Sequence, residues 1–96
     1  MEWRTALPEL SPLAQRMVQV LAQEQQARAG QPVALVRIAK CLDAPASSVL
    51  RELAMLNGRL QQAQQPAWVV ADASEGRWML ALTAAGAVAA AQIAEA

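Results

Sequence analysis

The spacing of apolar residues changes along the chain, and each change marks a different expected element. The first helix is expected over residues 12–29. Ser11 followed by Pro12 is typical of a helix start, because serine caps free N–H groups and proline at the first helical position loses no hydrogen bond. Gly30 stands where a residue just beyond the helix end is expected. The apolar residues at helical spacing are Leu13, Met17, Val20 and Leu21.

Three short segments follow the first helix. Residues 31–35 favour an extended conformation, and residues 36–42 predict a short second helix. Residues 43–45 predict a turn, since the residue before proline disfavours helix. A third helix is expected over residues 46–59. Gly58 favours a helix end there, whereas Leu60 favours one more helical turn. Its apolar positions are Val49, Leu50, Leu53, Leu56 and Leu60.

The period then changes from helical to alternating. Residues 68–71 and 78–82 are β-like runs, and the polar, glycine-containing residues 72–77 between them predict a hairpin loop. Thr83 is expected to cap a last helix over residues 84–95, which consists almost wholly of small residues.

This order of elements predicts an α+β fold, the winged helix-turn-helix, with a three-helix core, a two-stranded wing hairpin and a C-terminal helix. The 96 residues suffice for one compact domain, residues 1–96, with an N-terminal extension over residues 1–10 and the C-terminal helix over residues 84–95. No internal repeat and no second domain are recognised.

Charge is balanced overall but unevenly distributed. Eight basic and eight acidic residues give a net charge of zero, which argues against tight, non-specific DNA binding. Residues 37–59 nevertheless carry four basic residues against two acidic ones, whereas residues 66–96 carry one against three. The middle of the chain is therefore mildly basic.

Several function classes lack the residues they need. The chain has no histidine, so the commonest general base and the commonest metal ligand are missing. No catalytic pairing, phosphate-binding glycine loop or carboxylate cluster is recognised, so we expect neither an enzyme nor a metal or cofactor site. The absence of a signal-peptide pattern or a long apolar run, together with a lone cysteine, predicts a cytoplasmic protein.

Two motifs resemble those of a known family. Residues 36–60 resemble the helix-turn-helix core of bacterial regulators. The positions that match its spacing are Ile38-Ala39, Leu42-Asp43 and Ser47-Ser48-Val49-Leu50-Arg51. Leu82-Thr83-Ala84-Ala85-Gly86 resembles the Leu-Thr-x-x-Gly that leaves the wing in MarR-like and PadR-like winged-helix regulators. The resemblance implies double-stranded DNA binding and transcriptional regulation.

The chain departs from the family pattern at three places. Asp43 replaces the usual turn glycine, although aspartate tolerates the left-handed conformation. Pro45 and Ala46 replace the usual Ser-Pro, so the third helix is expected to lack its N-cap bond. The wing carries Asp72 and Glu75 and one arginine, which weakens the case for a wing contact with DNA.

The resemblance places the helix of residues 46–59 in the major groove. Arg51 is expected to contact a base, since arginine bonds guanine bidentately. Ser47 and Ser48 would contact the backbone or base edges, and Met55 a thymine methyl. The expected phosphate contacts come from Arg37, Lys40 and Arg59, with Arg77 reaching a phosphate or the minor groove from the wing. The alternative is that these side chains are only solvated charges, with Arg51 paired to a carboxylate.

Other residues also have two interpretations. Cys41 fits a redox switch beside Lys40, but a small buried hydrophobe is the favoured interpretation. Trp68 and Trp78 fit base stacking, but a core position is favoured for both. Trp3 lies outside the main domain and needs a surface that buries it.

Two further hypotheses concern partners. We expect a homodimer formed through the first helix, Trp3 and the alanine-rich last helix, since small residues let helices approach closely. The alternative is that the alanine content of the last helix reflects only helix propensity. As an alternative function, the zero net charge and the acidic wing favour a winged helix that binds a protein and not DNA.

Overall fold

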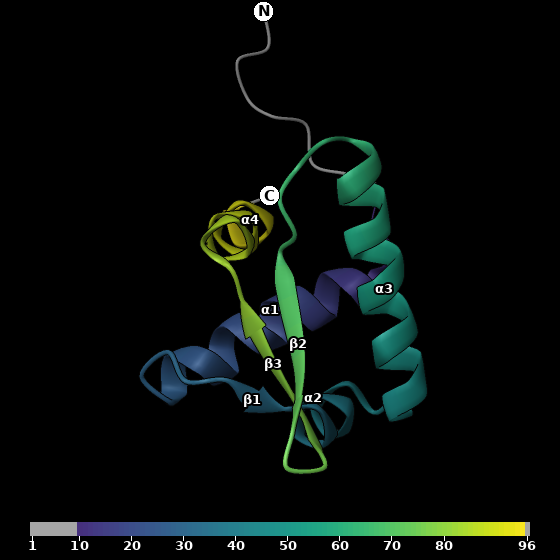
Figure 1. Cartoon of the computed structure of the whole chain (residues 1–96). Coiled ribbons are helices and arrows are strands. Elements are labelled where there is room, and N and C mark those ends of the chain that lie inside the picture. Colours follow the sequence, from purple (N-terminus) through teal and green to yellow (C-terminus); the bar gives the residue numbers. More distant parts are fainter. Residues whose placement is uncertain (1–9, 96) are drawn as a thin grey trace, which may run out of the picture.

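The computed structural model describes residues 10–95 and confirms the α+β winged-helix fold (Figure 1). Three helices, a three-stranded sheet and a last helix are connected by short segments. The elements are α1 (Pro12–Ala27), β1 (Val33–Ala34), α2 (Leu35–Leu42), α3 (Ala46–Gln62), β2 (Val69–Ser74), β3 (Arg77–Leu82) and α4 (Ala84–Glu95). The expected position of Trp3 and the extension over residues 1–9 lie outside the described residues.

The sheet has the strand order β1-β3-β2, and all pairs are antiparallel. The expected loop over residues 72–77 is wrong, because β2 and β3 continue through most of it. Only Glu75 and Gly76 form the turn, with φ of 53° and 75°, the positive values that a two-residue hairpin turn requires. Three of the four extra strand residues, Asp72, Ser74 and Arg77, are polar, and this part of the hairpin projects beyond the helices (Figure 1).

The two tryptophans of the hairpin have different environments. Trp68 is buried, as predicted, whereas Trp78 is 44 % exposed, so the core position expected for it is wrong. Strand phase places Trp78 on the same face as the buried Leu80. Trp78 lies two pairs nearer the tip than Leu80, where the hairpin projects beyond the helices, so its position on the inner face does not bury it.

Some helix ends differ by a few residues from those predicted from the sequence. Ser11 caps α1 as expected, its Oγ accepting the Ala14 N–H at 3.0 Å. α1 ends two residues early, and its left-handed residue is Ala29, with Gly30 one position later donating its N–H to Gln25 O. α3 runs through Gly58 to Gln62, because the turn beyond the glycine buries Leu60.

α4 is attached closely to the hairpin. Thr83 Oγ1 accepts the Gly86 N–H at 3.0 Å and donates to Ala67 O at 2.6 Å, so the predicted cap is confirmed. Gly86 passes so near the Trp68 carbonyl that a Cβ at this position would collide with its oxygen. The glycine of the Leu-Thr-x-x-Gly motif is therefore required by a close backbone approach.

The core lies between α1, α2, α3 and the inner face of the sheet. Its fully buried members come from every described element except α4, which contributes two alanines and an isoleucine that are nearly buried. Cys41 is not among them, because it lies on the exposed side of α2. The favoured interpretation of Cys41 as a buried hydrophobe is therefore wrong. The largest fully buried side chains are Met17, Leu21, Ile38, Leu60 and Leu80.

Candidate nucleic-acid interface

One face of α3 is exposed along the first half of the helix. Ser47, Arg51 and Met55 follow one another at four-residue intervals, so they lie on one side of the helix and form what we name the α3 stripe. The opposite side is buried against the core through Val49 and Leu53. Met55 is 46 % exposed. An apolar side chain and a guanidinium therefore project together from the same exposed surface.

Arg51 is not held by a neighbouring carboxylate. Glu52, next in the chain, accepts a hydrogen bond from Ser11 Oγ at 2.8 Å, which ties α3 to the start of α1. Arg51 itself makes no ion pair within residues 10–95. The alternative that Arg51 is paired to a carboxylate is therefore not seen in this part of the chain.

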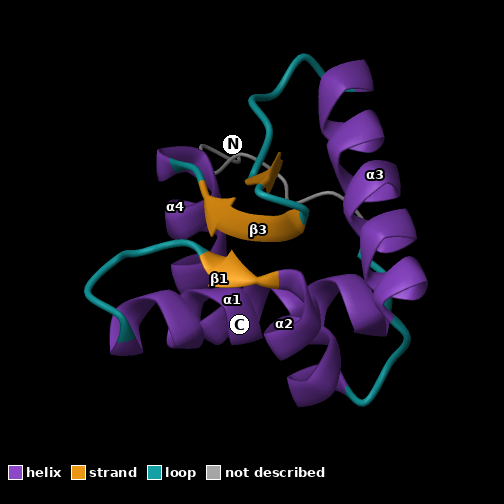
Figure 2. Cartoon of the chain, turned by 60° about the horizontal axis from the view of Figure 1, so that its bottom comes forward, coloured by secondary structure: helices purple, strands orange, loops and turns teal. Residues whose placement is uncertain are grey.

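The start of α3 lies at the same end of the molecule as α2 and the hairpin tip. Figure 1 shows all three at its lower end, and Figure 2 shows the short turn through which α2 passes into α3. Asp43 makes this turn in the left-handed conformation, with φ of 52°, as predicted. α3 then begins after Pro45 without a side-chain cap, also as predicted.

A group of cations lies beside this end, around a hollow of about 590 Å³ that we name the basic hollow. Three of its cations, Arg37, Lys40 and Arg77, are predicted site residues; Arg37 and Lys40 are neighbours on α2, and Arg77 comes from β3. The fourth is Arg28, just beyond α1. Four of the eight basic residues of the chain therefore line one surface depression.

Glu24 connects two of these cations. Its Oε1 accepts hydrogen bonds from Arg28 Nη1 at 2.7 Å and from Arg37 Nε at 2.9 Å. The hydrogen bond from Arg37, and then that from Arg28, holds the pKa of the Glu24 carboxyl below its ordinary value. The same carboxylate raises the pKa of Arg37. Glu24 and Arg37 are therefore charged at neutral pH.

Sequence reasoning did not include Arg28 and Glu24 among the site residues. Their four-residue spacing on a helix is a sequence signal for an ion pair. No pattern indicated that Arg37, thirteen residues after Glu24, joins the same carboxylate. That contact depends on how α2 packs against α1.

The remaining predicted site residues do not join the basic hollow. Ser48 is half-buried at the start of α3. Arg59 is exposed but lies about two helical turns beyond Arg51, toward the other end of α3. The predicted residues therefore divide into the α3 stripe, the basic hollow and these two outlying positions.

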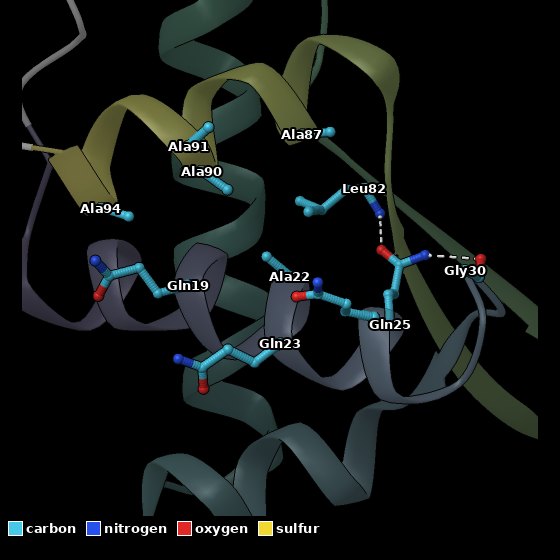
Figure 3. A pocket seen from close by; sticks show the side chains of 11 residues that line it. Gln19, Ala22, Gln23, Gln25, Gly30, Leu82, Ala87, Ala90, Ala91 and Ala94 are labelled. Atoms are coloured by element: carbon cyan, nitrogen blue, oxygen red, sulfur yellow. Dashed lines mark hydrogen bonds between the residues drawn. The ribbon is translucent and has the colours of Figure 1, made fainter.

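A second hollow, which we name the neutral hollow, lies between α1 and α4 and measures about 620 Å³ (Figure 3). Its walls are alanines of α4 and glutamines of α1, and none of its lining residues is charged. Gln25 closes one end, since its Oε1 accepts the Leu82 N–H at 2.7 Å and its Nε2 donates to Gly30 O at 3.1 Å. Both hydrogen bonds are drawn in Figure 3.

The chain is similar in fold to solved structures of other proteins. One is a protein of Ralstonia eutropha JMP134 provisionally named a DNA-binding protein; it shares 28 % identity over 88 % of this chain and 98 % of that one, with a TM-score of 0.68. Another is a mutant of ZitR from Lactococcus lactis, with 15 % identity and a TM-score of 0.63 over 99 % of this chain. The chain spans 57 % of ZitR.

No protein-family model and no curated protein matches the sequence. Among the described residues, no helix is long and apolar enough to cross a membrane. The same residues hold no group of three or more cysteine, aspartate or glutamate side chains placed to bind a metal ion.

Proposed function

We propose that this protein binds double-stranded DNA as a transcription regulator, with the first half of α3 in the major groove. The observation that carries the proposal is the α3 stripe, which presents Ser47, Arg51 and Met55 on one exposed face at the end of the fold where the hairpin also projects. A helix that presents such side chains at its N-terminal half fits base recognition.

Three further observations support DNA and not a catalytic role. The Ralstonia protein, similar over nearly its whole length, is named for DNA binding. The basic hollow lies beside the same end of the fold and suits phosphates. The segment from Leu82 to Gly86 matches the family motif, and the close approach of Gly86 explains its glycine. We infer a bacterial regulator of the MarR-like or PadR-like type that acts in the cytoplasm.

We also propose that two copies pair through α4 and α1. α4 is apolar nearly all round: Val88 is 60 % exposed, and Glu95 is the helix's one charged residue. A helix of this kind is normally covered on all sides. Light scattering coupled to size-exclusion chromatography tests this, and a monomer at about 100 μM, a loading far above the dissociation constant of a specific dimer, contradicts it.

Selection of bound sequences from a random duplex pool, followed by fluorescence anisotropy, tests DNA recognition. We expect enrichment of a site and binding that weakens with salt. Arg51→Ala is expected to weaken binding to the selected site about tenfold, consistent with the loss of one bidentate base contact. Arg51→Lys keeps the charge but not the fork, so it should keep non-specific affinity and lose sequence preference.

Arg16→Ala is the matched control, since Arg16 is an exposed arginine on α1 that belongs neither to the α3 stripe nor to the basic hollow. Failure of the wild type to bind any duplex at about 50 mM salt, where phosphate contacts are strongest, contradicts the proposal. The zero net charge and the acidic residues Asp72 and Glu75 then favour the alternative, a winged helix that binds a protein partner.

A further inference from the structure

The basic hollow joins side chains from separate parts of the fold. Arg28 comes from the turn after α1, Arg37 and Lys40 from α2, and Arg77 from the first position of β3. Its apolar lining residues include Val36, which is 67 % exposed. Four cations that converge on one depression raise the local potential far above what a neutral chain has on average.

The guanidinium groups keep hydrogen-bond donors for a ligand. Arg37 uses Nε for Glu24, and within residues 10–95 its two Nη atoms have no partner. Arg28 uses only Nη1, and its side chain is 40 % exposed. The Glu24 side chain is 17 % exposed and is not among the residues that line the hollow. Glu24 thus orders two cations while it leaves their outer nitrogens available.

We infer that Arg28 is a further phosphate-binding residue, which extends the proposed phosphate contact of the basic hollow to the end of α1 on the same duplex whose major groove α3 enters. The inference rests on the proposed function, because it needs a duplex positioned by α3. Forked arginine donors suit phosphate oxygens, and a duplex offers one phosphate charge about every 1.7 Å along its axis. A single small anion would use only part of a depression lined by four cations.

One acidic residue opposes this arrangement. The strand register places Asp72 beside Met79 and two pairs away from Arg77, on the face of the sheet that borders the hollow. Its negative charge lowers the attraction for phosphate at the wing side. The attraction is therefore strongest where Arg28, Arg37 and Lys40 meet, which makes Arg28 the informative residue to change.

The test measures the salt dependence of binding to the selected duplex for Arg28→Ala. Loss of one phosphate contact lowers the slope of log K against log salt by about 0.9. The affinity ratio of wild type to variant should therefore fall by about threefold between 50 and 200 mM salt. Arg28→Lys restores the charge and should restore the slope. Arg16→Ala, on α1 but outside the hollow, should leave the slope unchanged.

The outcomes separate the inference from the function on which it rests. If the wild type binds the duplex and Arg28→Ala shows the full wild-type slope, the inference is overturned and the proposed function stands. A wild type that binds no duplex overturns both. Circular dichroism of each variant verifies the fold; a lower slope in a folded Arg28→Ala, restored by Arg28→Lys, supports the inference.

Discussion

The two hollows of this protein have nearly the same volume, about 590 and 620 Å³, but opposite chemistry. α1 contributes glutamines to the neutral hollow, and the turn after it contributes Arg28 to the basic one. The basic hollow is surrounded by four cations, whereas the neutral hollow has no charged lining residue. The difference shows how a chain with no net charge separates a basic surface from an uncharged one.

The largest expected effect concerns the attachment of α4, which forms one wall of the neutral hollow. Gly86→Ala places a Cβ against the Trp68 carbonyl, so we expect a loss of about 3 kcal/mol in the free energy of unfolding. Urea denaturation measures it. Gly58→Ala is the control: no atom lies within 4 Å of its added Cβ, and a gain of about 0.5–1 kcal/mol is expected. Equal effects at the two glycines would contradict the close approach at Gly86.

The next prediction introduces a charge into the neutral hollow. Ala91 is exposed on α4 and lines this hollow, so Ala91→Glu would bury an unpaired carboxylate in the proposed dimer. We expect self-association to weaken at least about tenfold, which corresponds to about 1.4 kcal/mol. Sedimentation equilibrium measures the change. Ala91→Gln introduces a side chain of similar size without a charge and should have a much smaller effect. An unchanged dissociation constant of the dimer for Ala91→Glu would exclude α4 from the interface.

A smaller effect is expected at the wing side of the basic hollow. Asp72→Asn removes the negative charge nearest Arg77 on that face of the sheet. Because both groups are exposed and screened by salt, we expect DNA affinity to rise only about twofold. Anisotropy at about 50 mM salt, where such screening is weak, measures it. A fall in affinity would show that the Asp72 carboxylate supports the contact.

The smallest effect concerns Glu24, the carboxylate that joins Arg28 and Arg37 of the basic hollow. The folded-state pKa of Glu24 is lowered by Arg37 and Arg28, so its stabilisation is fully present above its unfolded pKa and is lost as pH falls through the folded value. The melting temperature of the wild type should therefore exceed that of Glu24→Gln at neutral pH, and the difference should shrink in acid. A difference that does not change with pH would show that the ion pairs contribute nothing.

Local signals were sufficient for the elements and their order. Ser11 and Thr83 mark helix starts, Asp43 marks the turn, and each of these predictions is confirmed by a hydrogen bond or a dihedral angle. These features depend on interactions within a few residues, which the sequence contains directly. The winged-helix fold followed from the order of those elements.

Burial along the hairpin and on α2 could not be predicted in the same way. The alternation that buries Leu80 also predicted a buried Trp78, but alternation identifies a face and not the point where the helices stop covering it. Cys41 is exposed on α2 although a buried position was favoured, and a short helix offers few turns from which to decide its inner face. Both errors concern the extent of packing and not the type of element.

The sequence by itself determined the elements, the caps, the turn and the exposed stripe of α3, because each depends on periodicity or on neighbours one turn away. Only the tertiary structure decided that Glu24 holds Arg37 as well as Arg28, and that Arg77 of the wing joins them around one hollow. The physical reason is that electrostatic contacts depend on distance in space. These residues are separated by up to 53 positions, and only the packing of α1, α2 and the sheet brings them together.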